Sequence, residues 1–305
     1  MIKNLVLGSG GHNLIRMMGC LQTLLNVKYI NQEEIENIYA TSAGAILGVY
    51  ICLKLNWETL IEYIISKPWT KKYETKPSAI FSAFDEKGIF GNEFVKDILE
   101  VQFKMKGLKT TITLKEFYEY SKINLKMYSF NLNKFKSECL DHETYPDLSV
   151  LDAVYMSSTF PFIFKPMYIN DSYYIDGGLD LDFPHDKCVK DDKKDEETLS
   201  IKIMHDTKEK NLPLKEGANI LEMAIYMFRK LIHENRIKNE LCIPKNYIEI
   251  RGEPFSLDSI SKIFDKENRR EWINDGREIA HNYLNQRTDL TNSFKLSSVG
   301  CASNS

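Results

Sequence analysis

The sequence lacks a long hydrophobic run, and this absence argues against a helix that crosses a membrane. Such a helix needs roughly 18 or more consecutive apolar residues, whereas the stretch ILGVYICLKLNW is interrupted by Lys54 and Asn56. The start, MIKNLVLGSGG, has only a short apolar run before its glycines, which is too short for the core of a signal peptide. We therefore expect a cytoplasmic protein, soluble or peripheral to membranes.

Paired cysteine motifs and stripes of one charge are also missing. The six cysteines form no C-x-x-C pair, and Cys20 and Cys52 lie inside apolar patterns, which indicates reduced and mostly buried thiols. The 40 basic and 43 acidic residues give a formal charge of −3. Nucleic acid is not an expected partner, because binding it requires a basic surface that neutralises phosphates.

The chain has no internal repeat and no evident linker. Its 305 residues, 43% of them hydrophobic, are enough to bury one large core. We expect a single domain over residues 1–290 and a flexible tail, rich in serine and asparagine, over residues 291–305. Residues 67–107 contain two prolines and several aromatic residues between charges, and they form either a lid or a surface excursion.

Two consecutive strand-turn-helix patterns near the N-terminus predict an α/β fold. KNLVLGSGG precedes the helical pattern NLIRMMGCLQTLLNV, and ENIYATS precedes AGAILGVYICL. This arrangement predicts a central, mostly parallel sheet with helices on both faces. Further on, the sequence predicts strands at INLKMYSFNLN, LSIKIMHD and NYIEIRG, a hairpin turning at Asn170-Asp171, and helices at LSVLDAVYMSS, around Ile220 to Ile237, and at ENRREWINDGREIAHNYL.

Ser42 lies in the pentapeptide Ala40-Thr41-Ser42-Ala43-Gly44, where the second strand turns into a helix. A tight elbow of this kind is marked by G-x-S-x-G, because bulk two residues before or after the serine obstructs the turn. Gly44 fits the pattern, and Ala40 replaces its first glycine with a residue that fits if its φ is negative. Ser42 is either a nucleophile at the positive end of the helix dipole or an ordinary N-cap.

The first strand is followed by a glycine turn, Gly8-Ser9-Gly10-Gly11. The backbone N–H groups of such a turn can donate to an oxyanion in acyl transfer. Two other interpretations are a purely structural turn and a dinucleotide-binding G-x-G-x-x-G motif, although Asn13 stands at the third glycine position of that motif.

Asp176 ends the aromatic-rich strand YYID and is followed by two glycines. A carboxylate held against a serine hydroxyl can act as its general base. Alone, Asp-Gly-Gly is a frequent turn. Here it is the third motif, after the serine elbow and the glycine turn, that lies at the end of a predicted strand and fits the same acyl-transfer mechanism.

These segments together resemble the patatin-like phospholipase family. The resemblance is carried by LVLGSGGHNLIRMMGCLQTL, YATSAGAILG and YIDGGLDLDFP, with LDAVYMSSTFPFIFKP and WINDGREIAHNYL as further similar segments. It implies a three-layer patatin-like fold and a phospholipase A-like lipid acyl hydrolase. The implied substrate is a lipid or phospholipid acyl ester, cleaved through an acyl-enzyme without a cofactor or a metal, and any membrane contact is expected to be peripheral.

The resemblance also assigns roles to residues. Ser42 would be the nucleophile and Asp176 the base, and the oxyanion would be bound by the amides of Gly10, Gly11 and Ala43. The candidate substrate contacts are His12, Asn13 and Arg16. Asn13 stands where the family has an arginine, and Arg16, one turn further along the same helix face, is a candidate replacement for it.

Three alternatives remain open from the sequence. One is a catalytically impaired lipid-binding or interaction module, favoured by Asn13 and Ala40. The second is a Ser-His-Asp esterase using a later histidine such as His205. The third and weakest is nucleotide binding at the glycine turn.

Overall fold

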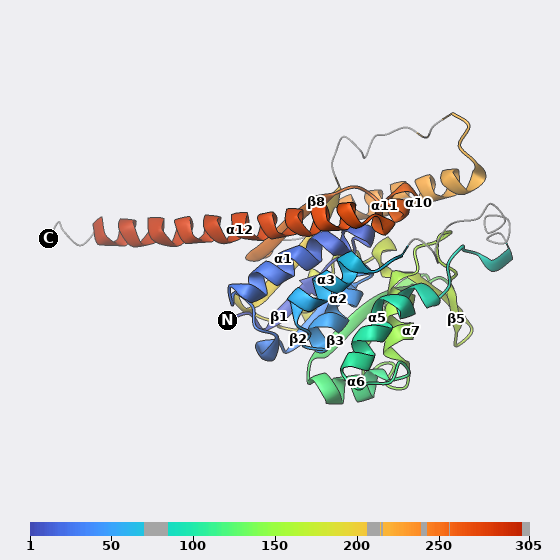
Figure 1. The fold of residues 1–305 in the computed structure, drawn as a ribbon, viewed down its shortest axis with the longest axis horizontal. Coiled ribbons are helices and arrows are strands. Elements are labelled where there is room, and N and C mark those ends of the chain that lie inside the picture. The colour runs from blue at the N-terminus through green and yellow to red at the C-terminus, as the bar shows by residue number, and fades with distance from the viewer. Residues whose placement is uncertain (70–84, 206–213, 215, 239–242, 256, 301–305) are drawn as a thin grey trace.

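A computed structural model describes residues 1–69, 85–205, 214, 216–238, 243–255 and 257–300 (Figure 1). The strands are β1 Asn4–Leu7, β2 Asn37–Thr41, β3 Asn124–Asn131, β4 Lys136–Leu140, β5 Met167–Ile169, β6 Ser172–Asp176, β7 Thr198–His205 and β8 Asn246–Gly252. The α-helices are α1 Leu14–Asn26, α2 Ala43–Cys52, α3 Trp57–Ser66, α5 Glu93–Met105, α6 Leu114–Ser121, α7 Val150–Ser158, α8 His185–Lys190, α10 Ile220–Lys238, α11 Leu257–Phe264 and α12 Lys266–Gly300. Short 3₁₀ turns are η1 Gly11–Asn13, η2 Gln32–Glu34, η3 Gly177–Leu179 and η4 Asp195–Glu197.

Within the described residues, the strands form one eight-stranded mixed sheet in the order β5-β6-β3-β2-β1-β7-β8, with β4 paired to β3. Along this order, β3, β2, β1, β7 and β8 run parallel to one another. The pairs β3–β4, β3–β6 and β5–β6 are antiparallel. The predicted α/β class and the mostly parallel centre are thus confirmed. The sheet differs from the sequence prediction by the added strand β4.

One face of the sheet carries the main core. Leu5, Leu7, Ile38 and Ala40 alternate along β1 and β2 and are fully buried, as the period of two in a strand requires. The helices α1, α2 and α7 pack on this side, and Figure 1 shows α12 lying along α1. The backbones of α1 and α12 touch, because a Cβ at Gly19 would lie 2.0 Å from the Ile273 carbonyl oxygen.

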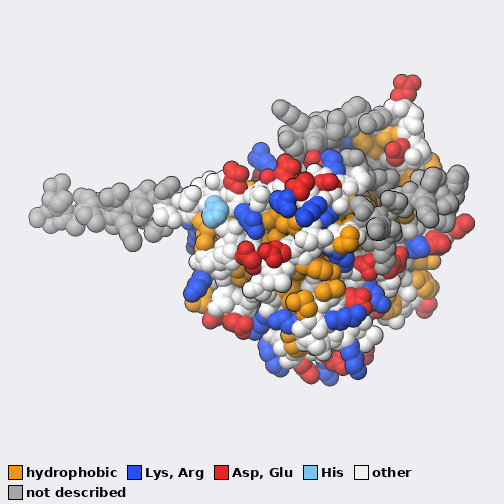
Figure 2. Space-filling model, viewed as in Figure 1, with side chains coloured by type: hydrophobic (Ala, Val, Ile, Leu, Met, Phe, Trp, Pro, Cys, Tyr) orange, Lys and Arg blue, Asp and Glu red, His pale blue; other side chains and the backbone are white. Residues whose placement is uncertain are grey.

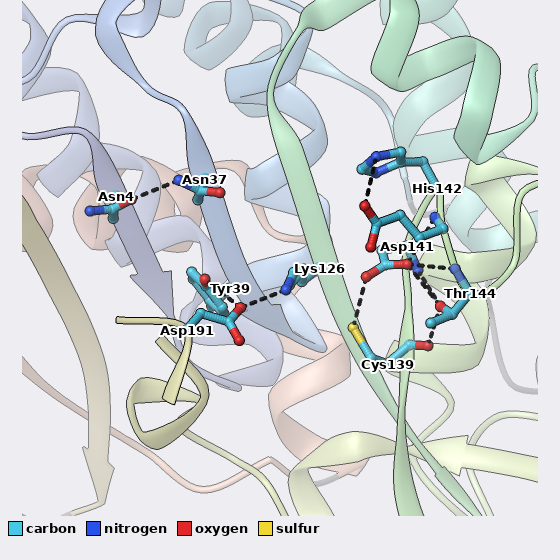
Figure 3. Close-up of polar contacts among 10 residues, drawn as sticks. Asn4, Asn37, Tyr39, Lys126, Cys139, Asp141, His142, Thr144 and Asp191 are labelled. Atoms are coloured by element: carbon cyan, nitrogen blue, oxygen red, sulfur yellow. Dashed lines mark hydrogen bonds and ion pairs between the residues drawn. The ribbon is translucent and has the colours of Figure 1, made fainter. Parts of the chain in front are cut away.

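The opposite face has a thinner cover. Val6, Tyr39 and Tyr128 point to this side and pack with Cys188 of α8. Polar contacts add to this packing: the Tyr39 hydroxyl donates to Asp191 Oδ2 at 2.8 Å, and Lys126 pairs with the same carboxylate (Figure 3). Helices therefore lie on both faces, as predicted, although α8 has only six residues.

The structure bears on the expected lid or excursion, the C-terminal tail, the cysteines and the absence of a membrane-spanning helix. Residues 70–84 of the expected lid or excursion lie outside the described part, and α5 within the same range packs against α7 with Val95, Leu99 and Phe103 buried. The tail expected from residue 291 is helical as far as Gly300. Among the described cysteines, Cys20, Cys52, Cys139 and Cys188 are free thiols. No helix in the described ranges has both the length and the apolar character needed to cross a bilayer.

Candidate active site

Ser42 occupies a strained elbow between β2 and α2. Its φ of 56° and ψ of −116° lie in a region that residues other than glycine rarely adopt. The side chain makes no capping bond to α2, so the N-cap interpretation does not account for this serine. The turn is tight because α2 starts against β1: a Cβ at Gly44 would lie 2.1 Å from the Leu7 carbonyl oxygen.

Asp176 reaches this elbow because β2 and β6 share one edge of β3. Thr41 pairs with Tyr128, and the next residue of β3, Ser129, pairs with Asp176. Since β4 occupies the other edge of β3 over Met127–Asn131, β2 and β6 must meet end to end on the same edge. The last residues of the two strands therefore lie side by side, although they are far apart in the sequence.

The two side chains are joined by a direct hydrogen bond. Ser42 Oγ donates to Asp176 Oδ2 at 2.6 Å, across 134 residues of sequence. The other carboxylate oxygen, Oδ1, accepts from the Gly178 N–H at 2.7 Å, which fixes the plane of the carboxylate. Both side chains are buried, so the pair is held away from bulk water.

Gly177 is required by this close approach. A Cβ at this position would lie 2.3 Å from the Tyr128 carbonyl oxygen, a distance that real side chains do not reach. The two glycines after Asp176 thus allow η3 to turn directly against β3.

The C-terminal end of α7 supports the elbow through contacts that the sequence did not predict. The Ser42 N–H donates to Ser157 Oγ at 2.9 Å, and Ser157 Oγ in turn donates to the Tyr128 carbonyl at 2.7 Å. The Asp176 N–H donates to the Thr159 carbonyl at 2.9 Å. In the sequence, SSTF is recognisable only as a segment rich in small residues. The groups that it bonds belong to the elbow, to β3 and to β6.

The glycine turn lies next to both motifs. The Ser9 N–H donates to the Asp182 carbonyl at 2.7 Å, which ties the turn to the loop after Asp176, and η1 contacts α2. Gly10 has no room for a side chain, because its Cβ would lie 2.7 Å from Ile203. Gly11 has a φ of 53°, which favours glycine. That the amides of Gly10, Gly11 and Ala43 bind an oxyanion stays a prediction.

Asn13 and Arg16 form a network behind the glycine turn. Asn13 is fully buried, and its amide nitrogen donates to the carbonyls of Gly10 and Glu253 at 3.1 and 3.0 Å. Arg16 Nη1 donates to Asn13 Oδ1 at 2.9 Å and its Nε to Asp275 at 3.3 Å. The predicted neighbourhood of Asn13 and Arg16 is therefore present. The contacts seen bind the two residues to the protein, and substrate contact by either stays a prediction.

His12 belongs to η1 and lies between aromatic rings. Its ring centroid is 5.1 Å from that of Trp272 and 6.3 Å from that of Phe255. Neither ring nitrogen has a hydrogen-bond partner in the described part of the protein. Burial, with Arg16 and Lys262 nearby, lowers the pKa of His12 to about 3, so the imidazole is uncharged at neutral pH and only weakly basic.

The histidine alternative for the base concerns His205, the last residue of β7. Its side chain lies outside the described side chains, so the Ser-His-Asp hypothesis stays untested at that residue. Ser42 and Asp176, in contrast, bond to each other without an intervening group.

Comparison with known proteins identifies a family, relatives in sequence and a solved structure of similar fold. A sequence model described as patatin-like phospholipase matches residues 5–188, more than half of the chain. The chain is 27% identical over 226 residues to the probable lipid hydrolase 463L of Invertebrate iridescent virus 6, covering 69% of this chain and 73% of that protein. It is 24% identical over 183 residues to the uncharacterized protein R571 of Acanthamoeba polyphaga mimivirus, covering 60% of each. Among solved structures, VipD from Legionella pneumophila superposes with a TM-score of 0.52 at 15% identity, over 93% of this chain and 67% of VipD.

Proposed function

Because the chain belongs to the patatin-like phospholipase family, we propose that it is a lipid acyl hydrolase that cleaves acyl esters through Ser42 and Asp176. The family and the relative named as a probable lipid hydrolase support lipid hydrolysis. The residues and the acyl-enzyme route are the finer part of the proposal.

The first half of the reaction forms an acyl-enzyme. Ser42 Oγ attacks the ester carbonyl carbon while its proton passes to Asp176 Oδ2, along the hydrogen bond already present. The carbonyl oxygen becomes an oxyanion and accepts hydrogen bonds from the amides of Gly10, Gly11 and Ala43. The C–O bond to the alcohol then breaks, and the leaving oxygen takes the proton from Asp176.

The second half reverses these roles with water. Asp176 accepts a proton from a water molecule that attacks the acyl carbon, and the Ser42 oxygen leaves with that proton. The fatty acid is released and the free enzyme is restored. A carboxylate suffices as the base because its orientation is fixed by the Gly178 amide and its partner hydroxyl is in direct contact.

The observation that carries this proposal is the 2.6 Å bond between Ser42 and Asp176 at a strained elbow. A serine that served only as a helix cap would bond to the first turn of α2 and would not need positive φ. Strain of this kind persists where the surroundings hold it, and here the surroundings orient the hydroxyl towards a buried carboxylate.

The test is a panel of phospholipid, galactolipid and neutral-lipid esters, with released fatty acid measured for wild type, Ser42→Ala and Asp176→Asn. We expect release by wild type and a loss of at least about 10³-fold in both variants. A fluorophosphonate probe should label wild type and not Ser42→Ala. Equal release by all three proteins would contradict the assignment, and absent labelling of wild type would favour the impaired lipid-binding module. His205→Ala should retain turnover, whereas a Ser-His-Asp esterase would lose it.

A further inference from the structure

The helix α10 exposes an apolar stripe to solvent. Ile220, Met223, Met227 and Leu231 are between 44% and 63% exposed, and spacings of three and four residues place them on one side of the helix. We call these four residues the α10 stripe. Exposed contiguous apolar surface on a soluble protein marks an interaction site.

The opposite side of α10 packs over the candidate active site. The helix contacts η3, the turn that follows Asp176, and Ile225 is buried. The Phe228 ring lies 5.7 Å from that of Phe160, which lies 5.3 Å from that of Phe255. Phe160 directly follows Thr159, whose carbonyl accepts from the Asp176 N–H. Contacts between aromatic rings therefore connect α10 with the candidate active site.

More apolar residues are exposed at the same edge of the sheet. Ser42 lies at the carboxyl end of β2. The β3–β4 and β5–β6 hairpins project beyond this end of the sheet, because β3 continues past Tyr128, the last residue that it pairs with β2. Phe135 and Tyr168, one from each hairpin, are exposed. Figure 1 places α10 and β5 at the same end of the molecule, and Figure 2 shows both hydrophobic and charged side chains at that end.

Basic side chains accompany these apolar ones. Lys230 lies beside the α10 stripe with its ammonium 5.6 Å from the Tyr226 ring centre, and Lys134 and Lys136 flank Phe135 in sequence. Apolar and aromatic side chains bordered by lysine suit the boundary between acyl chains and polar head groups.

We propose that the α10 stripe docks the protein on the surface of a lipid aggregate, such as a bilayer, with the hairpin aromatics as a second contact. The proposal rests on the proposed function, since it supplies the surface from which a lipid ester enters the site. A second copy of this chain on the stripe would cover the same end of the molecule and obstruct that entry. A lipid surface is the occupant that brings substrate to it.

The test compares wild type with the triple variant Met223→Ser, Met227→Ser, Leu231→Ser. Binding is measured by flotation with vesicles of phosphatidylcholine, alone and with added phosphatidylglycerol. Turnover is measured on these vesicles and on the water-soluble ester p-nitrophenyl butyrate. We expect the variant to bind vesicles about 10-fold or more weakly, with a matching loss on vesicle lipid and unchanged p-nitrophenyl butyrate hydrolysis.

A matched control carries three equally exposed changes outside the stripe: Val27→Ser, Met105→Ser and Val189→Ser. These residues are between 50% and 64% exposed, and we expect wild-type vesicle binding from this control. Equal loss in the control, or wild-type binding by the stripe variant, would overturn the proposal. A wild-type dimer that becomes monomeric in the stripe variant, without any vesicle binding, would assign the stripe to a second copy instead.

The outcome is separable from that of the catalytic proposal. Ser42→Ala leaves the stripe intact and should bind vesicles as wild type does, even if no ester is hydrolysed. If wild type binds vesicles through the stripe but cleaves nothing, docking stands and the catalytic assignment fails.

Discussion

Acid should destabilise this protein through His12, and the effect can be isolated by one substitution. The imidazole is 2% exposed, and within the described part of the protein neither of its nitrogens has a hydrogen-bond partner. Protonation would place a charge among Trp272 and Phe255 without a partner, with Arg16 and Lys262 nearby, and for this reason its pKa is lowered from 6.5 to about 3. The unfolded chain binds a proton more readily than the folded chain does between these two values.

The magnitude follows from this difference in pKa. Above pH 6.5 neither state is protonated at this residue, and His12 adds no pH dependence. As the pH falls from 6.5 towards 3, the free energy of unfolding drops by about 1.4 kcal/mol for each pH unit, because only the unfolded state takes up the proton. At a pH of about 5 the loss should be roughly 2 kcal/mol.

The assay is urea unfolding of wild type and His12→Phe at two pH values, about 7.5 and about 5. Phenylalanine keeps an aromatic ring against Trp272 and cannot titrate, so the variant should lose roughly 2 kcal/mol less than wild type on acidification. His281→Phe serves as the control, since His281 is exposed. Identical pH dependence in wild type and His12→Phe would refute the reasoning, because it would mean that the imidazole reaches a proton-stabilising partner or water.

Three further substitutions test the contacts that hold the candidate active site in place. Ser157→Ala leaves the Ser42 N–H without its acceptor, and we expect about 10-fold lower kcat with little change in KM on a soluble ester, restored in part by Ser157→Thr. Gly177→Ala puts a methyl group 2.3 Å from a backbone oxygen of β3, and it should cost about 2–3 kcal/mol, seen as a lower Tm; an unchanged Tm would contradict the packing. Asn13→Leu removes the bond to the Gly10 carbonyl and should cost about 1–3 kcal/mol in urea unfolding together with a reduced kcat, whereas a role in substrate binding alone would raise KM at unchanged stability.

Local patterns in the sequence predicted much of the fold. The two strand-turn-helix units became β1-η1-α1 and β2-α2, since apolar periodicity and glycine turns are short-range signals. The hairpin was predicted at Asn170-Asp171, and both residues have positive φ, 48° and 54°, as such a turn requires. The strand β4 was missed because apolar and polar residues do not alternate clearly in KSECL.

The geometry of the site could not be derived from the same signals. That β2 and β6 end against each other on β3 depends on the register of three strands, and register is set by tertiary packing. For the same reason the sequence did not identify Ser157, which looks like an ordinary small residue in a helix until its bonds to the Ser42 N–H and the Tyr128 carbonyl are known. The spacing of three residues did predict that Asn13 and Arg16 share one helix face, where they contact each other, but spacing alone does not tell which other groups they bind.

The strain at Ser42 explains why so many contacts converge on one residue. A conformation of this kind costs about 1–3 kcal/mol, and it is held by the bond from its N–H to Ser157 and from its hydroxyl to Asp176. Ala40, which departs from the elbow pattern, lies within β2 opposite Leu7 and is not among the described residues with positive φ, so its methyl group is accommodated in the core. The elbow therefore depends less on a glycine before the serine than on its contacts with α7 and β6, and changes at these contacts should reduce turnover although they leave the pentapeptide intact.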